Sequence, residues 1–256
     1  MGLLDGKNIL ITGVVTKQSI AYRTVEVALE QGATVVTTSL TRAMSLTARV
    51  LRSVQPTPPL IELDVTNDEQ LATLADRLGE HVDHLDGIVH SIAFANPARA
   101  LGGAFLSTQW NDVDIALHTS AYSLVSLTMA CKPLLRRPAS VVGLTFDARM
   151  TWPAYDWMGV AKAALESTSR YLARYLGPDG VRCNLISAGP LDTMAKKAIP
   201  GANAFDDVWA ARAPLGWDST DATAAAKGVV ALLSDWFPAT TGEMIHVDGG
   251  LHSTGA

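Results

Sequence analysis

Residues 144–162 read Leu-Thr-Phe-Asp-Ala-Arg-Met-Thr-Trp-Pro-Ala-Tyr-Asp-Trp-Met-Gly-Val-Ala-Lys. This stretch holds the two residues around which the chain is organised, Tyr155 and Lys162, between an apolar run and a long helical pattern. On a helix their spacing is two turns, so both side chains project from one face, roughly 10 Å apart along the axis. Pro153 lies just before Tyr155, where a proline suits the first turn of a helix.

A phenol and an ammonium on one helix face can act together. The phenol can polarise a carbonyl, and the ammonium can hold the hydroxyls of a cofactor and lower the pKa of the phenol. Taken alone, the pair also fits an ordinary amphipathic helix with a solvated lysine. The rest of the chain has to decide between these interpretations.

The composition favours one globular α/β domain over residues 1–256, since 48% of the residues are hydrophobic and 18% are charged. The net charge of −5 is spread out, so we expect neither nucleic acid nor a membrane as a partner. Cys131 and Cys183 form no disulfide framework and no metal motif, so we expect a cytoplasmic protein without a metal. Asp5 interrupts the N-terminal stretch, which does not resemble a signal peptide. The uncharged run between Asp114 and Lys132 carries polar residues and favours a buried helix over a membrane span.

Seven apolar runs alternate with helical patterns along the chain. The predicted strands are 7–13, 33–38, 60–64, 85–91, 140–145, 181–187 and 243–247. The predicted helices are 19–32, 42–54, 67–80, 109–131, 155–176 and 220–234. Because the strands are continuously apolar, we expect them to be buried on both faces. The pattern therefore predicts a Rossmann-like, doubly wound, seven-stranded parallel sheet with helices on both faces.

Two long connections, 91–108 and 188–217, leave the carboxyl ends of strands, where open α/β sheets place their ligands. The second connection is predicted to be irregular, with a substrate-binding lid at about 190–212. Its apolar residues favour a greasy wall over an ordinary surface loop. These are Leu191, Met194, Ile199, Phe205, Val208 and Trp209.

The turn after the first strand is compatible with a dinucleotide, although it lacks the GxGxxG pattern. Only Gly13 of that pattern is present, and Ser19 and Ile20 stand where a helix begins, so backbone amides and a hydroxyl could hold a pyrophosphate. An ordinary strand–helix turn fits equally well. Asp64 could accept from an adenine amine and Ser91 could let the backbone approach a ribose, but each could instead cap a turn. The segment Leu40-Thr-Arg after the second strand does not choose between a 2′-hydroxyl and a 2′-phosphate.

Nearly the whole chain resembles the NADH-dependent enoyl-acyl-carrier-protein reductases, a divergent branch of the short-chain dehydrogenase/reductases, with most likeness to the mycolic-acid-pathway type. The most specific motif is Tyr-x6-Lys at Tyr155 and Lys162. Ordinary members of the wider family have Tyr-x3-Lys, but the residue four after Tyr155 is Gly159. Other matching stretches are 2–7, 13–21, 63–65, 90–92, 120–122, 153–158, 160–162, 188–190, 212–214, 232–236 and 239–242.

The resemblance implies roles for these residues. Tyr155 would hydrogen-bond the thioester carbonyl, Lys162 would hold the nicotinamide ribose, and Phe146 would help to seat the substrate. The implied cofactor is NADH, with NADPH not excluded. It would contact Gly13, Ser19, Ile20, Leu40, Asp64, Val65, Ser91, Ile92, Ala93, Lys162, Ala188, Gly189, Pro190, Leu191 and Thr193. The implied substrate is a fatty enoyl thioester of acyl carrier protein or coenzyme A. It would contact Phe94, Phe146, Tyr155, Met158, Met194 and Ile199.

The chain also departs from the mycolic-acid branch. Thr145 replaces an acid before the aromatic residue, and the segment after Gly189 is shorter. A shorter lid encloses less acyl chain, so we expect substrates of ordinary fatty acyl length. The helices at 109–131 and 155–176 are apolar on more than one side, which predicts a twofold interface, and the resemblance implies a homotetramer.

Two alternatives remain. The first is a 3-oxoacyl or other carbonyl reductase of the same fold, which would need Tyr-x3-Lys and a catalytic serine on the fifth strand; the chain has neither. The second is a catalytically silent dinucleotide sensor. The presence of both Tyr155 and Lys162 argues against it, but residue types alone do not exclude it.

Overall fold

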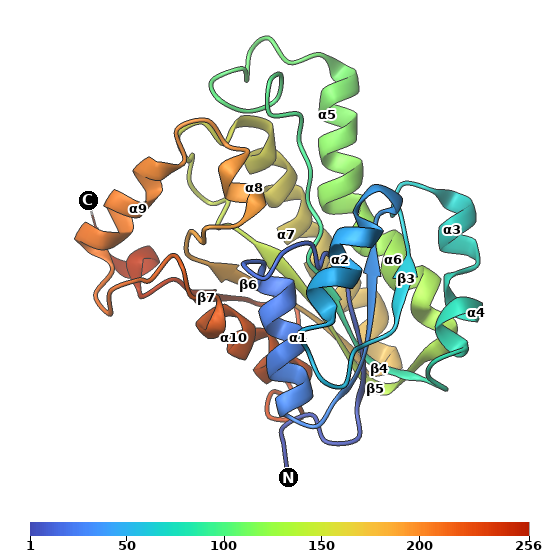
Figure 1. The fold of residues 1–256 in the computed structure, drawn as a ribbon. Helices are drawn as coiled ribbons and strands as arrows, with labels where there is room; N and C mark the ends of the chain where they lie inside the picture. The colour runs from blue at the N-terminus through green and yellow to red at the C-terminus, as the bar shows by residue number, and fades with distance from the viewer. Residues whose placement is uncertain (256) are drawn as a thin grey trace.

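A computed structural model describes residues 1–255, and its centre is a seven-stranded sheet whose strands are all parallel (Figure 1). The strand order is β3-β2-β1-β4-β5-β6-β7. The strands are β1 (Asn8–Ile11), β2 (Thr34–Ser39), β3 (Leu60–Glu62), β4 (Leu85–His90), β5 (Leu135–Thr145), β6 (Val181–Ala188) and β7 (Met244–Val247). The order reverses between β1 and β4, which is the position where sheets of this kind bind ligands.

Helices cover both faces of this sheet. They are α1 (Ile20–Glu30), α2 (Met44–Leu51), α3 (Asp68–Ala72), α4 (Leu74–Gly79), α5 (Trp110–Leu117), α6 (Ser123–Cys131), α7 (Asp156–Leu176), α8 (Met194–Lys197), α9 (Asn203–Arg212) and α10 (Thr223–Leu233). Short helical turns are η1 (Thr41–Ala43), η2 (His118–Tyr122), η3 (Lys132–Leu134), η4 (Gly177–Asp179) and η5 (Leu251–Ser253).

Successive residues of β1 pack into two separate hydrophobic cores, one on each face of the sheet. Ile9 and Ile11 pack in a cluster with residues of α1, α2 and α10, whereas Leu10 between them packs with residues of α3, α4, α6 and α7. Side chains alternate between the faces of a strand, so each strand must be apolar throughout to bury both. The predicted doubly wound parallel sheet is confirmed.

Several predicted boundaries are right because their local signals are strong. Ser19 caps α1 by accepting a hydrogen bond from the Tyr22 amide at 3.1 Å, and Asn67 caps α3 by accepting from the Gln70 amide at 3.0 Å. Gly180 follows η4 in the left-handed conformation, with a φ of 73°.

Other predictions of secondary structure are wrong. The segment 188–217 is not irregular, because it contains α8 and α9. The predicted helix 109–131 is interrupted by the π-helical turn η2, and 67–80 divides into α3 and α4. The fifth strand begins at residue 135 rather than 140. Phe205, Val208 and Trp209 carried a helical spacing that could have revealed α9.

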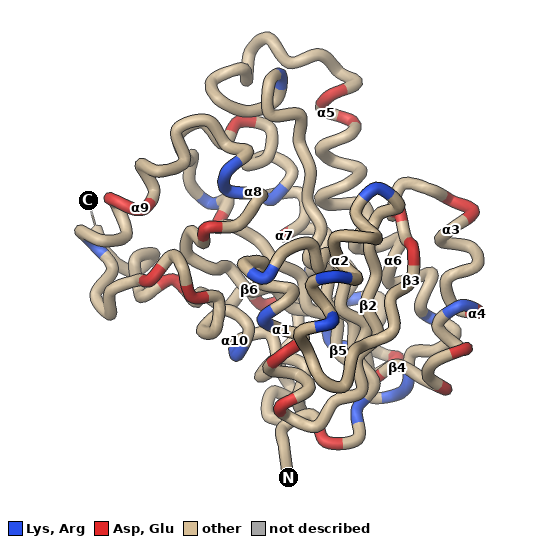
Figure 2. Tube along the Cα trace, viewed as in Figure 1, with Lys and Arg blue, Asp and Glu red and all other residues tan. Residues whose placement is uncertain are grey.

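The elements that follow the carboxyl ends of the strands gather at one end of the molecule. In Figure 1 the loop before α5, together with α8 and α9, lies at the upper end, opposite the N-terminus. Acidic and basic residues are interspersed along the chain (Figure 2). No helix within residues 1–255 is long and apolar enough to cross a membrane.

Candidate active site

The helix that carries the tyrosine and the lysine begins at Asp156, one residue later than predicted, so Tyr155 is its N-cap and Pro153 lies outside it. Ala154 and Asp156, on either side of Tyr155, have positive φ angles of 61° and 40°. Such conformations cost on the order of 1–3 kcal/mol each in residues other than glycine and cluster at functional sites. The Asp156 carboxylate accepts hydrogen bonds from the amides of Gly103 and Ala104 at 2.6 and 3.0 Å, which ties the 91–108 loop to the start of α7.

The Tyr155 side chain is 7% exposed and packs in an apolar cluster that includes Ala95, Leu101 and Met158. Burial raises the pKa of its phenol, and the charge of Glu166 adds to this effect. The prediction that Lys162 lowers this pKa is therefore wrong for this structure, because desolvation of the phenolate is the largest effect.

The Tyr155 hydroxyl nevertheless keeps some exposure. It forms no hydrogen bond within residues 1–255, yet the polar side-chain atoms there that are fully buried without a partner are Arg77 Nε, His90 Nδ1 and Arg182 Nη1. The ring is thus packed, while the hydroxyl remains able to meet a ligand. Neither of the two cavities described below has Tyr155 in its lining.

Lys162 is buried, with 6% of its surface exposed, so the interpretation of it as a solvated lysine is wrong. Its Nζ donates a hydrogen bond to the Leu144 carbonyl oxygen at 2.8 Å, at the end of β5. Burial lowers the pKa of Lys162 to about 8, and the charge of Glu166 acts in the opposite direction. An amine with this pKa is mostly charged near neutral pH, although it is buried against the end of β5.

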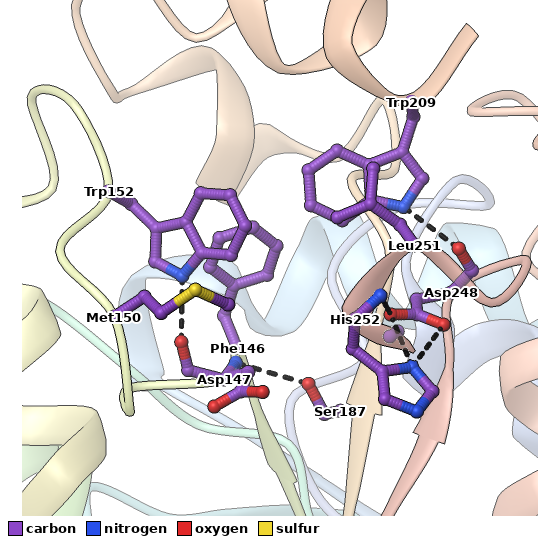
Figure 3. Close-up of a pocket in the computed structure, with 10 residues that line it drawn as sticks. Phe146, Asp147, Met150, Trp152, Ser187, Trp209, Asp248, Leu251 and His252 are labelled. Atoms are coloured by element: carbon purple, nitrogen blue, oxygen red, sulfur yellow. Dashed lines mark hydrogen bonds and ion pairs between the residues drawn. The ribbon is translucent and has the colours of Figure 1, made fainter. Parts of the chain in front are cut away.

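An aromatic cluster covers Phe146, the residue that follows β5. Its ring centre lies 4.8 Å from Trp152, 5.5 Å from Tyr155 in an edge-on arrangement, and 5.7 Å from both Phe205 and Trp209 of α9. Figure 3 shows the indole of Trp152 beside Phe146 and the indole of Trp209 facing them from the other side. Phe205 and Trp209 of the predicted apolar wall thus lie on α9 and pack onto Phe146.

Little space remains beneath this aromatic cluster. A cavity of about 10 Å³, lined in part by Phe146, Trp152, Trp209 and Leu251, has room for about one water molecule. A second cavity of about 450 Å³ opens beside α8 and the start of α9, where Ile199 and Pro200 line it. In the lining of this cavity, Lys196 Nζ forms ion pairs with Asp192 at 2.7 Å and with Asp206 at 2.6 Å, and the second pair links α8 to α9.

The predicted substrate residues are only partly brought together. Tyr155, Met158 and Phe146 belong to one apolar cluster, and Ile199 packs against it half-buried. Phe94 and Met194 are instead 41% and 58% exposed. The two exposed residues lie on the 91–108 loop and on α8, so they flank the cluster rather than form it.

The predicted cofactor residues lie where parallel strands end, on both sides of the switch between β1 and β4. Gly13 has a φ of 80°, and a Cβ atom there would lie 1.9 Å from the Ser91 carbonyl oxygen, so only glycine fits between these strand ends. The dinucleotide fits this position, because the turn that begins at Gly13 leads to the Ser19 N-cap and the amides at the start of α1. The other predicted residues lie at the end of β6 or follow β2, β3, β4 and β6. They are Leu40, Asp64, Val65, Ile92, Ala93, Ala188, Gly189, Pro190, Leu191 and Thr193.

Three of these residues have local structural partners. The Asp64 carboxylate accepts from Thr66 N at 2.9 Å and Thr66 Oγ1 at 2.7 Å, which is the turn-capping alternative. The Thr193 hydroxyl accepts from the Lys196 amide at 3.2 Å and so caps α8. A Cβ at Gly189 would lie 2.7 Å from the Trp209 and Trp217 indoles, which explains why that position has no side chain.

Sequence reasoning missed several residues near Phe146. Trp152 Nε1 donates to the Asp147 carbonyl oxygen at 2.7 Å. The buried Asp147 carboxylate contacts Arg149 Nε at 2.9 Å and His246 Nε2 at 2.8 Å, and the His246 ring stacks 3.8 Å from His252. Glu166 was also missed, although its position four residues after Lys162 places it on the same helix face. Within residues 1–255, no group of three or more His, Cys, Asp or Glu side chains is arranged to hold a metal ion.

The comparisons with known proteins agree with this geometry. A family model described as Enoyl-(Acyl carrier protein) reductase matches residues 13–252. The chain is 45% identical to the NADH enoyl-acyl-carrier-protein reductase of Mycolicibacterium smegmatis, over 97% of each chain. It is 38% identical to the NADH enzyme of Neisseria meningitidis, over 98% and 96% of the two chains, and 37% identical to the NADPH enzyme of Staphylococcus aureus, over 98% of each. With Tyr155 and Lys162 on one buried helix face below the carboxyl edge of the sheet, the chain belongs to the enoyl-(acyl carrier protein) reductase family.

Proposed function

We propose that this protein is an NADH-dependent enoyl-acyl-carrier-protein reductase, which reduces the trans-2,3 double bond of a fatty enoyl thioester in fatty acid elongation. The observation that carries the proposal is the placement of two buried residues, Tyr155 at the N-cap of α7 and Lys162 seven residues later within α7. Residue 159, where the ordinary carbonyl reductases carry their lysine, is a glycine, and a Cβ atom placed there would lie 3.6 Å from the Tyr155 ring. This disfavours the carbonyl-reductase alternative.

The reaction needs a negative charge to be stabilised on the thioester oxygen. NADH would supply the hydride for the β-carbon, and solvent water would supply the proton for the α-carbon. The Tyr155 hydroxyl donates a hydrogen bond to the thioester carbonyl and steadies the enolate, an effect worth about 3 kcal/mol for one well-placed donor. The Phe146 and Tyr155 rings pack edge-on with their centres 5.5 Å apart, and this contact helps to fix the direction of the hydroxyl.

Cofactor binding is assigned to the strand ends described above. Lys162 holds the nicotinamide ribose, and the turn from Gly13 to Ile20 holds the pyrophosphate through the α1 amides. The cofactor that we assign is NADH, because the Mycolicibacterium smegmatis and Neisseria meningitidis relatives are named for it. The Staphylococcus aureus relative is named for NADPH. NADPH is therefore the comparison cofactor in every assay.

The substrate is an acyl thioester of acyl carrier protein or coenzyme A with a chain of ordinary fatty acid length. The segment 190–212 acts as the lid, and its packing onto Phe146 through Phe205 and Trp209 supports a short acyl tunnel. If kcat/KM kept rising for acyl chains well beyond those of membrane lipids, this part of the proposal would be wrong.

A direct assay tests the activity. Purified protein is mixed with NADH and a trans-2-enoyl thioester, and the nicotinamide absorbance is followed. Consumption of NADH that depends on the thioester supports the proposal. Binding of NADH without its consumption across a series of thioesters would instead favour a dinucleotide sensor, and turnover of 3-oxoacyl thioesters alone would favour a carbonyl reductase.

We propose a homotetramer that works in the cytoplasm. Large apolar side chains on α5, η2, α6 and α7 remain exposed in the single chain, which supports a self-complementary interface. They are Trp110, Tyr122, Met129, Val160, Tyr171 and Tyr175. Cys131 and Cys183 are buried free thiols, as expected in a reducing compartment. Light scattering on the wild type tests the assembly, and a monomer would contradict it. Cell fractionation tests the compartment.

A further inference from the structure

The carboxylate of Glu166 is buried at the site but has no part in the proposed reaction. The residue is 7% exposed and lies one helical turn after Lys162 on α7. Taking a carboxylate out of water is unfavourable unless hydrogen bonds and opposite charge compensate for it. The partners of Glu166 therefore indicate what it does.

The hydrogen bonds of Glu166 end on both sides of Phe146. Its Oε1 accepts from Thr145 Oγ1 at 3.1 Å and from the Ala148 amide at 3.0 Å. Thr145 is the last residue of β5, and Ala148 lies in the turn that follows. One oxygen on α7 thus fixes the short segment that presents Phe146 to Tyr155.

The charge of Glu166 acts on one buried cation of its own helix, Lys162. Lys162 lies four residues earlier on the same helix face, and the attraction between the two raises the pKa of Lys162 against the lowering effect of burial. The charge of Glu166 also acts on Arg149, which is mostly engaged with Asp147. On β4, burial lowers the pKa of His90 to about 3, so His90 faces Lys162 without a charge near neutral pH.

We propose that Glu166 is a positioning residue, whose Oε1 holds the Thr145–Ala148 turn around Phe146 and whose negative charge keeps the buried Lys162 in its ammonium form for cofactor binding. The second part rests on the proposed function of Lys162 as the residue that holds the nicotinamide ribose. Glu166 touches no reacting atom in this scheme.

The Glu166→Gln variant tests the charge, because glutamine can still accept from Thr145 and Ala148 through its carbonyl oxygen. The wild-type affinity for NADH is expected to fall as the pH rises through the pKa of Lys162, about 8. Without the neighbouring charge this fall is expected at lower pH. At pH 8 the Kd for NADH, followed by cofactor fluorescence, should rise at least about threefold relative to wild type, and the two proteins should agree within about twofold at pH 6.

Two further variants separate charge from structure. Thr145→Val removes one hydrogen bond to Glu166 but keeps the charge, so its NADH binding should follow the wild-type pH profile while kcat falls through the loosened Phe146. Glu166→Asp keeps the charge and withdraws the carboxylate from Thr145 and Ala148, so it too should keep the wild-type pH profile of NADH binding while kcat falls. Glu80→Gln, at an exposed acid that directly follows α4, is the matched control.

If Glu166→Gln bound NADH with the pH profile of wild type, the role of the charge would be overturned. If Thr145→Val had the wild-type kcat, the role of Glu166 in holding the Thr145–Ala148 turn would be overturned. NADH binding is read without turnover, so these results stay distinct from a failure of the enoyl reductase assignment. If the enoyl reductase assignment itself failed, wild-type protein would bind NADH but would not consume it with any enoyl thioester.

Discussion

The Lys162 ammonium donates a hydrogen bond of 2.8 Å to the Leu144 carbonyl oxygen, which joins the middle of α7 to the end of β5. This contact fixes the distance between the helix that carries Tyr155 and the strand that carries Phe146. Burying an amine in its charged form is unfavourable. The position of Lys162 against the end of β5 therefore lowers the stability of the fold at the proposed cofactor site.

Replacing Tyr155 with phenylalanine should abolish most turnover and leave the fold intact. The change removes only the hydroxyl, which makes no hydrogen bond within residues 1–255, so thermal unfolding should stay within about 1 kcal/mol of wild type. The loss of one donor to the enolate should lower kcat by roughly 10²–10³-fold while NADH still binds. Steady-state kinetics and an NADH titration measure both, and a variant with wild-type kcat would remove Tyr155 from the reaction.

Replacing Lys162 with methionine should change how stability depends on pH. Burial lowers the pKa of Lys162 from 10.5 to about 8, so the unfolded chain binds more protons between these values. The penalty for the buried charge is fully present below pH 8 and is relieved as the pH rises towards 10.5. The unfolding free energy of wild type, relative to Lys162→Met, should therefore increase on the order of 2–3 kcal/mol over this interval.

Chemical denaturation at a series of pH values measures this difference. Lys197→Met, at an exposed lysine on α8, is the control and should show no such change relative to wild type. A constant difference between Lys162→Met and wild type from pH 7 to pH 10 would mean that Lys162 is not buried as a charge.

Replacing Gly13 with alanine should destabilise the protein and weaken NADH binding. The new methyl group would lie 1.9 Å from the Ser91 carbonyl oxygen, and the φ of 80° disfavours any side chain. Separating the ends of β1 and β4 should cost about 2–4 kcal/mol. Gly6→Ala, with a similar φ of 74° but open space around it, isolates the effect of φ alone and should be the more stable of the two variants.

Replacing Asp147 with asparagine should loosen the link between the turn after β5 and the C-terminal segment. Burial opposes ionisation of Asp147, but hydrogen bonds from Arg149 and His246 outweigh it and hold the pKa of this carboxyl below its usual range. The resulting stability is complete above the ordinary pKa of 3.8 and is lost as the pH falls below it. At pH 7 the variant should lose about 1–3 kcal/mol, and the difference from wild type should shrink in acid.

Unfolding at pH 7 and at pH 3 checks the prediction for Asp147. Asp207→Asn, at an exposed acid on α9, should behave as wild type at both values. If the difference between wild type and Asp147→Asn grew in acid, the ion pair with Arg149 would not be its source.

Replacing Phe205 with leucine should lengthen the acyl chain that the enzyme accepts. The Phe205 ring lies 5.7 Å from Phe146 and 6.1 Å from Trp152, and removing it opens space in the aromatic cluster. The ratio of kcat/KM for long over short enoyl thioesters should rise at least about threefold, at a cost of about 1–3 kcal/mol in stability. Trp236→Leu, at an exposed indole, controls for general loosening and should leave the ratio unchanged.

The sequence by itself determined the fold and the pair of residues that organises the site. Continuously apolar strands separated by helical patterns can bury their two faces only in a parallel sheet covered on both sides. The spacing of Tyr155 and Lys162 predicted that both lie near the start of one helix, and the structure places Tyr155 at its N-cap and Lys162 within it. Ser19 and Asn67 mark the starts of α1 and α3, and Gly180 marks the end of η4, because caps and left-handed turns depend on the chemistry of single residues.

Only the tertiary structure decided the environment of those residues. That Tyr155 is packed rather than open, and that Lys162 is buried against Leu144, depend on contacts with β5 and the 91–108 loop, which no local pattern specifies. The helix α9 depends on the packing of Phe205 and Trp209 against Phe146, about 60 residues away, although its spacing was visible. Burial sets the pKa of each group and the space left for a ligand, and burial is a property of the folded chain alone.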